Sequence, residues 1–316
     1  MPCYNEQDHI AAKIEALKNQ LPSNIAYELL IFSDGSDDDT NSILEAYKKD
    51  ERIEIFIQPT RSGKPKALNF LVSKAKYPIL LFSDTRQSLG DHCISLLLSD
   101  MTDPSIGASS AMLVHSNNNS VFRKWINKVK ELESIAGSTI GSYGCFYMIR
   151  KNLYQDLPSD LILDDLYTPI HIIGQSYRVI MNPLAMVYDR SFPDMYQSGR
   201  MNRINKGLVQ ILGLKNGPIS KLPFQYKLAF FFQKFGKFLI PLLLIFQYLL
   251  LLLLAILGYY KTPIIVETGL LCMVLLLGFV FGIKMLKEIV HIFLRYLKTL
   301  PSLLARKQDI LWEKMK

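Results

Sequence analysis

The stretch YELLIFSDGSDDDT (residues 27–40) runs from an apolar, β-rich segment directly into a loop that contains four aspartates. Two segments of the same kind follow, IEIFIQ (53–58) and PILLFSD (78–84). Patterns typical of helices lie between and around them, at residues 6–19, 38–49, 64–76 and 91–100. Strands that alternate with helices predict an α/β fold built on a doubly wound, mainly parallel sheet.

Acidic residues stand at the ends of the predicted strands. In a doubly wound sheet, ligands bind beyond the carboxyl ends of the strands. Asp34 and Asp84 each end an apolar run, so we expect them to lie side by side on one rim of the sheet. The segment from Asp37 to Thr40 is instead predicted to form the first turn of a helix, where carboxylates interact favourably with the helix dipole.

Basic residues are concentrated in the last third of the chain. Residues 215–316 contain 14 Lys and Arg against 4 Asp and Glu, and the whole chain carries a net charge of +8. The same third contains two long apolar runs, 238–260 and 262–283, which predict two transmembrane helices. Basic residues flank both runs, so the positive-inside bias places both flanks in the cytoplasm. This arrangement indicates contact with membrane lipid and argues against nucleic-acid binding.

These features divide the chain into four predicted parts. Residues 1–214 form a cytoplasmic α/β domain, 215–237 an amphipathic segment at the membrane interface, 238–283 a transmembrane helical hairpin, and 284–316 an amphipathic cytoplasmic tail. A third span at 284–304 is the alternative, which would bury several charges. We therefore expect a multi-pass protein of the plasma (inner) membrane.

Seven segments occur in an order and spacing typical of one enzyme family. They are MPCYNEQDHI, DGSDDDT, SGKPKALN, FSD, GSYGCFYMIRKNLY, LPSDLILDDLY and GRMNRINKG. Together with the predicted membrane helices they resemble the family 2 glycosyltransferases, and among these the membrane-bound branch of cellulose, chitin and hyaluronan synthases. The resemblance implies a GT-A fold and the transfer of a sugar, with inversion, from a nucleotide diphosphate sugar in which UDP is the expected nucleotide.

An inverting transferase needs a base that removes the proton from the acceptor hydroxyl. The segment LDDLY (163–167) supplies two adjacent acids just before a helical pattern. By resemblance to the family's Glu-Asp pair, Asp165 is the expected base and Asp164 its neighbour. Two adjacent carboxylates can raise one pKa of the pair, which favours this role. An ordinary acidic pair in the first turn of a helix is the alternative.

The resemblance also implies a nucleotide pocket. Tyr4, Glu6 and Asp34 match family positions that line the pocket for the base and ribose, and Lys64 matches a position near the diphosphate. Gly63 allows close backbone approach, and the helix after it would point its N-terminus toward phosphate. In the alternative interpretation Tyr4 and Glu6 only begin a helix, and Lys64 is solvated.

The metal site departs from the family pattern. The family's Asp-x-Asp motif, which binds Mg²⁺ or Mn²⁺ together with the diphosphate, corresponds here to Asp84, Thr85 and Arg86. Asp84 alone could hold the metal with water and phosphate, Arg86 could pair directly with phosphate, or the site could be inactive. We expect retained activity with a divalent cation, Mg²⁺ or Mn²⁺, at Asp84.

Two further segments carry residues implied by the resemblance. In YQSGRMNRINKGLVQIL (196–212), Arg200 and Arg203 lie one helical turn apart and could meet the diphosphate. A basic helix face that touches anionic lipid is the equally weighted alternative. Gly141 begins GSYGCFYMIR and is expected to belong to a glycine-rich wall close to the acceptor.

Family members begin with an apolar strand before the Pro-x-Tyr-Asn-Glu motif, whereas Met1 directly precedes Pro2 here. We therefore expect the first strand to be missing and apolar surface to be uncovered beside it. An unrecorded upstream start explains this better than a truncated product does.

The predicted activity adds a sugar to a growing polysaccharide or to a lipid-linked glycan acceptor. Candidate protein partners are further copies of the chain or subunits of a polysaccharide-export assembly. A catalytically impaired scaffold or binding subunit of such an assembly is the alternative, because Arg86 replaces the second metal-binding acid. Transfer of a single sugar to a lipid phosphate is a third interpretation.

Overall fold

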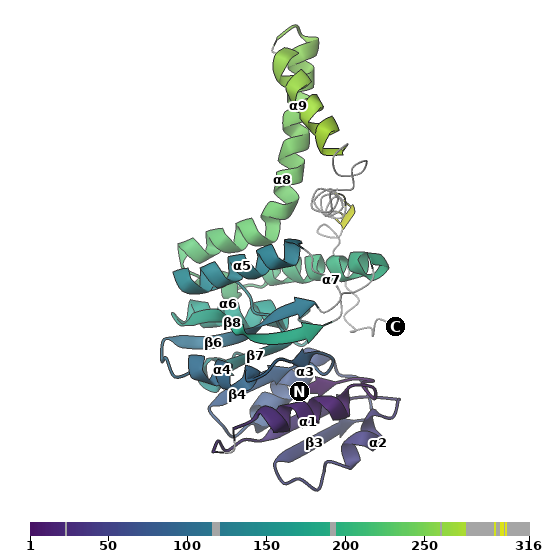
Figure 1. The fold of residues 1–316 in the computed structure, drawn as a ribbon, viewed down its shortest axis with the longest axis vertical. Helices are drawn as coiled ribbons and strands as arrows, with labels where there is room; N and C mark the ends of the chain where they lie inside the picture. Colours follow the sequence, from purple (N-terminus) through teal and green to yellow (C-terminus); the bar gives the residue numbers. More distant parts are fainter. Residues whose placement is uncertain are drawn as a thin grey trace. The chain divides into compact units, whose positions relative to one another are not determined.

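The computed structural model describes residues 1–22, 24–115, 121–189, 194–259 and 261–275, together with Leu294, Lys298, Thr299 and Pro301. Among these, side chains are not described at several positions in helices, including five within residues 237–244. The chain forms two compact units (Figure 1). Residues 1–196 and 207–223 belong to the first unit, and residues 197–206 and 224–306 to the second.

The first unit begins with a parallel three-stranded sheet in the order β1-β2-β3. Figure 1 labels β3 and the helices α1, α2 and α3 of this part of the chain. Its strands are β1 (Pro2–Cys3), β2 (Leu29–Asp34) and β3 (Ile53–Gln58), and its helices are α1 (Ile10–Gln20), α2 (Thr40–Glu45) and α3 (Lys64–Lys74). Pro2 pairs with Phe32, and Asp34 pairs with Gln58. Since parallel strands need crossover connections, α1 and α2 lie between successive strands in the chain. The predicted α/β class is confirmed.

A second sheet in the same unit has five strands in the order β4-β7-β6-β8-β5. They are β4 (Ile79–Ser83), β5 (Ser88–Leu89), β6 (Ile106–His115), β7 (Phe146–Arg150) and β8 (Arg178–Asp189). Only β6 and β8 pair in parallel, because β7 enters antiparallel between β4 and β6, and β5 pairs antiparallel with β8. The prediction of a parallel sheet is therefore correct for β1, β2 and β3 and for the pair β6 and β8, and wrong for β5 and β7, which run antiparallel to their neighbours.

The core of the first unit packs helices against the second sheet. In α1, Ile10, Ile14 and Leu17 are buried at the spacing of one helix face. They belong to one apolar cluster with residues of α4 (Cys93–Asp100), among them Ile94, and with Phe146 of β7. Each such side chain contributes about 1.5–3 kcal/mol when it is removed from water. This packing holds the strand ends from which the site is built.

Three further helices complete the first unit or enter it. They are α5 (Val121–Ala136), α6 (Asp164–Gly174) and α7 (Asp194–Gly213). The last part of α7 packs on the segment before α6: Gln210 accepts a hydrogen bond from the backbone N–H of Ile162 at 3.0 Å and donates one to the carbonyl of Asp160 at 2.8 Å. These contacts hold the beginning of α6.

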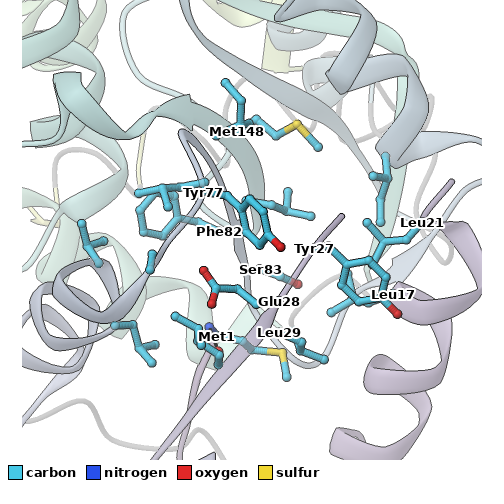
Figure 2. A pocket seen from close by; sticks show the side chains of 18 of the residues that line it. Met1, Leu17, Leu21, Tyr27, Glu28, Leu29, Tyr77, Phe82, Ser83 and Met148 are labelled. Atoms are coloured by element: carbon cyan, nitrogen blue, oxygen red, sulfur yellow. Dashed lines mark hydrogen bonds between the residues drawn. The ribbon is translucent and has the colours of Figure 1, made fainter. Parts of the chain in front are cut away.

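An apolar cavity of about 380 Å³ lies in the first unit, lined by residues of β2, β4 and three helices. Figure 2 shows Leu17, Leu29, Phe82 and Met148 around it. None of the predicted site residues lines this cavity. The strand β1 consists of Pro2 and Cys3 and pairs with β2. The prediction that the apolar strand before Pro2 is missing stays a prediction.

The second unit contains α8 (Phe224–Ile256) and α9 (Lys261–Leu275). The two helices meet at Tyr248 and Thr268, whose hydroxyl oxygens lie 3.1 Å apart. Helix α8 begins within the predicted interface segment 215–237 and continues without a break into residues 238–256.

Among the residues that the structure describes, no helix is both long and apolar enough to cross a membrane. The predicted spans at 238–260 and 262–283, and the hairpin that they would form, are therefore not supported. Residues 276–283 of the second span, and most of the predicted amphipathic tail, lie outside the described residues.

Candidate active site

Asp34 fixes the loop that leads into α3. Its Oδ1 accepts hydrogen bonds from the backbone N–H of Ser62 at 2.6 Å and from the Ser62 hydroxyl at 2.8 Å, and its Oδ2 accepts one from the N–H of Gly63 at 2.8 Å. Gly63 has a φ of +94°, which favours glycine. The Asp34 carboxylate is buried and binds this loop. Its predicted contact with the base and ribose stays a prediction.

The loop delivers Lys64 to two carboxylates from distant parts of the chain. The Lys64 Nζ lies 3.1 Å from Asp84 Oδ1 and 3.2 Å from Asp164 Oδ2. Burial by itself would lower the pKa of Lys64, but the carboxylates of Asp164 and Asp84 outweigh it and raise that pKa above its usual value. Lys64 is therefore a largely buried cation that pairs with two carboxylates, and not the solvated side chain of the alternative interpretation. Asp34 ends β2 of the first sheet, whereas Asp84 follows β4 of the second sheet, so the two acids do not end neighbouring strands of one sheet.

Asp165 is the second residue of α6, beside Asp164. A Cβ atom added to Gly144 would lie 2.5 Å from the Asp165 Cβ, so the two residues are in direct contact. The backbone N–H and the hydroxyl of Ser142 donate hydrogen bonds to the Asp165 carbonyl at 3.2 and 3.3 Å. Gly141 has a φ of +87°, and its carbonyl accepts a hydrogen bond from Lys130 Nζ at 2.6 Å. The glycine-rich segment thus lies against the predicted base.

Tyr4 forms a flat surface together with Arg61, which the sequence did not predict. The Arg61 Cζ lies 3.9 Å from the centre of the Tyr4 ring. A Cβ on Gly35, which has a φ of +71°, would lie 2.8 Å from the Arg61 backbone nitrogen, so glycine is needed there. A guanidinium stacked on an aromatic ring can extend a stacking surface for a planar base.

The aspartates that follow Gly35 connect two loops. The N–H of Asp37 donates to Asn5 Oδ1 at 3.0 Å, and the N–H of Gln7 donates to Asp38 Oδ2 at 3.2 Å. Asp38 also accepts from the N–H of Thr40 at 3.0 Å, at the beginning of α2. The acidic cluster is therefore largely structural, as predicted for Asp38. Glu6 is buried and belongs to the same loop as Asn5 and Gln7. Its backbone N–H donates a hydrogen bond to the Thr40 hydroxyl at 2.8 Å.

Arg86 has a partner that the sequence did not predict. Its Nε lies 3.2 Å from Asp189 Oδ1 and its Nη2 lies 2.9 Å from Asp189 Oδ2. Asp189 is the last residue of β8 and is buried. An acid at the end of an apolar strand pattern, the signal used for Asp34 and Asp84, also marks Asp189 in the sequence.

Arg200 and Arg203 lie on α7, within residues 197–206 of the second unit. Their predicted contact with a diphosphate stays a prediction.

The described residues offer few ligands for a divalent cation. Within the described part of the chain, no group of three or more His, Cys, Asp or Glu side chains could hold a metal ion. Asp84 can offer a carboxylate oxygen, and Mg²⁺ and related ions are often held by one or two carboxylates with substrate phosphates and water. Asp84 is therefore the residue that would hold such an ion.

Comparison with known proteins identifies the family. Residues 1–158, half of the chain, match the family described as Glycosyl transferase family 2. A poly-beta-1,6-N-acetyl-D-glucosamine synthase of Staphylococcus epidermidis is 23% identical over 201 residues, and one of Staphylococcus aureus (strain MSSA476) is 26% identical over 204 residues. Each alignment covers 60% of this chain and 48% of the relative, so the chain spans about half the length of these curated relatives.

Solved structures show the same fold. The mannosyltransferase PcManGT from Pyrobaculum calidifontis, in complex with GDP-Man and Mn²⁺, is 18% identical, with a TM-score of 0.74 over 97% of this chain and 86% of the other. The S. aureus TarS 1-349 structure with UDP-GlcNAc is 17% identical, with a TM-score of 0.51 over 70% of this chain and 67% of the other. The sequence match over residues 1–158 and these shared folds lead to one conclusion: the chain belongs to glycosyl transferase family 2.

Proposed function

We propose that this protein transfers a sugar from a UDP-sugar to a growing polysaccharide or a lipid-linked glycan, with inversion at the anomeric carbon. The observation that carries the proposal is the group of charged side chains formed by Asp84, Lys64 and Asp164, in which Lys64 pairs with both acids and Asp165 follows Asp164. Asp84 follows β4, Lys64 begins α3 and Asp164 begins α6. A cation between two carboxylates at such a position is an arrangement suited to a charged ligand.

The residues fit the steps of such a transfer. Asp165 accepts the proton of the acceptor hydroxyl as that oxygen bonds to the anomeric carbon, and the bond from this carbon to the phosphate oxygen breaks. The nucleoside diphosphate leaves with the bonding electron pair, so negative charge grows on its phosphates. Lys64 and Arg86 are the side chains proposed to offset that charge. A divalent cation at Asp84 would supply further positive charge to the leaving group.

The choice of nucleotide and acceptor rests on the relatives. The curated relatives are named as poly-beta-1,6-N-acetyl-D-glucosamine synthases, and one structural neighbour contains UDP-GlcNAc. Another contains GDP-Man, so the nucleotide must be tested directly. The neighbours that contain Mn²⁺ support the proposal of a divalent cation.

The test is transfer of radiolabelled sugar by the purified protein in the presence of Mn²⁺. UDP-GlcNAc, UDP-glucose and GDP-mannose are the donors, and polymer and lipid fractions are separated on a gel. Asp165→Asn is expected to abolish transfer. Asp160→Asn is the matched control, because Asp160 is an exposed acid five positions earlier. Full transfer by Asp165→Asn would remove Asp165 from the mechanism.

A scaffold subunit of a polysaccharide-export assembly is the second candidate. It is favoured by Arg86, which stands where a second metal-binding acid is expected and is paired with Asp189. In that case the wild type binds nucleotide but transfers no sugar with any donor or acceptor. Pull-down of export subunits or of further copies of the chain would then identify the partner.

The location of the protein is also our proposal: we infer that it works at the plasma membrane. Large apolar side chains on α8 are exposed, among them Leu243, Phe246, Leu249, Leu253 and Ile256. Their exposure supports contact with lipid. Cell fractionation followed by a high-pH wash tests the proposal, and recovery of the full chain in the soluble fraction before any wash would contradict it.

A further inference from the structure

Asp84 and Arg86 lie two residues apart in the segment that follows β4. Along residues 84–87, Thr85 and Gln87 are buried, whereas Asp84 is partly exposed and Arg86 exposed. The chain bends at Thr85 and Arg86. The Arg86 guanidinium is therefore accessible close in the chain to Asp84, the carboxylate that would hold a metal ion and that pairs with Lys64.

Asp189 holds Arg86 in a defined position. The two ends of the carboxylate pair with Nε and Nη2 of Arg86, in the two-point geometry typical of strong charge-assisted hydrogen bonds. The Asp189 side chain is 8% exposed and the Arg86 side chain 39% exposed. The carboxylate thus lies beneath the guanidinium, which stays accessible from solvent.

A second contact fixes Asp189 itself. Gln87 Nε2 donates to Asp189 Oδ2 at 3.0 Å, so one carboxylate receives hydrogen bonds from two successive residues of the segment. The backbone carbonyl of Gln87 accepts a hydrogen bond from the buried Lys13 of α1. These contacts tie the segment after β4 to α1 and β8. The position of Arg86 is therefore set by buried groups.

We propose that Asp189 is a positioning residue, which holds the Arg86 guanidinium against the diphosphate of the donor where the family motif has a second acid. The proposal rests on the proposed function, because it takes a nucleoside diphosphate as the ligand. A guanidinium has five N–H donors and can join a carboxylate on one edge to a phosphate on another. A guanidinium that is already held loses less side-chain freedom on binding, so the clamp increases affinity for the phosphates.

The proposal predicts that loss of Asp189 lowers the affinity for the diphosphate part of the nucleotide and leaves the affinity for the nucleoside part unchanged. Binding of UDP and of uridine to the full chain is measured by calorimetry, with and without Mn²⁺, and GDP and guanosine replace them if the wild type prefers guanine. Asp189→Asn is expected to weaken diphosphate binding by about tenfold and to change nucleoside binding less than twofold. Asp50→Asn is the matched control, because Asp50 pairs with Arg52 in the same two-point geometry in an exposed loop.

Arg86→Lys provides a second variant if Asp189→Asn does not fold. It keeps the positive charge but cannot make the two-point contact, so it should weaken diphosphate binding to a similar extent. An unchanged ratio of diphosphate to nucleoside affinity in every variant that folds would overturn the role of Asp189, whatever happens to stability. A wild type that binds no nucleotide at all would overturn the proposed function instead.

Discussion

The ammonium group of Lys64, at the beginning of α3, lies 3.2 Å from a carboxylate oxygen of Asp164, at the beginning of α6. Both side chains are largely buried, with exposed fractions of 18% and 10%. Burial of a charge is costly unless a partner compensates it, so each residue depends on the other. The pair joins two helices that begin far apart in the chain.

Lys64→Met is expected to destabilise the fold by about 3–5 kcal/mol at pH 7.5, because it leaves buried carboxylates without their cation. In the wild type the raised pKa of Lys64 makes its stabilising contribution fully present below about pH 10.5. The contribution is lost only as the pH rises further, so Lys64 should cause no change in the free energy of unfolding of the wild type between pH 6 and 9. Urea unfolding across this pH range measures the effect.

Lys48→Met is the control for this prediction. Lys48 pairs with Glu45 on the surface, so its loss should have little effect at pH 7.5. A loss of stability in Lys64→Met no larger than that in Lys48→Met would contradict the electrostatic explanation.

Gly144→Ala should move Asp165 and reduce sugar transfer by about 10- to 100-fold, since small displacements of a catalytic group are costly. The added Cβ would lie 2.5 Å from the Asp165 Cβ. Initial rates with the preferred donor, together with the melting temperature, measure the effect. Gly213→Ala is the control, because nothing lies within 4 Å of a Cβ added there. Normal rates in Gly144→Ala would show that the position of Asp165 does not limit transfer.

Asp34→Asn should destabilise the loop before α3 by about 1–3 kcal/mol. The Asn side chain has one acceptor oxygen where Asp34 has two. It therefore cannot accept the hydrogen bonds from both the Ser62 N–H and the Gly63 N–H. Because the same loop delivers Lys64, nucleotide affinity should fall together with stability. Chemical denaturation and UDP calorimetry measure the two effects, and Asp8→Asn, at an exposed position, is the control.

Three cysteine thiols should be unreactive in the folded protein. Burial raises the pKa of Cys3, Cys93 and Cys145 to about 12, so almost no thiolate is present at pH 8. With Ellman's reagent at pH 8, these three should react only as the protein unfolds in urea. Rapid modification of Cys145, located by mass spectrometry, would contradict the packing described for β7.

The sequence alone determined the features that depend on neighbouring residues. The apolar runs at 27–34, 53–58 and 78–84 predicted β2, β3 and β4, and the helical pattern at 64–76 predicted α3. The acids that end two of these runs indicated where the site would lie. Strand propensity, turn residues and helix beginnings are local properties, and a short segment carries enough information to specify them.

The tertiary structure decided which distant groups meet. It inserted β7 between β4 and β6, stacked Arg61 on Tyr4, and placed Asp189 under Arg86. It also bound the Asp34 carboxylate to the loop that leads into α3. Sheet order and buried ion pairs depend on how the whole chain closes around its core, because a buried charge is stable only where packing brings a partner to it.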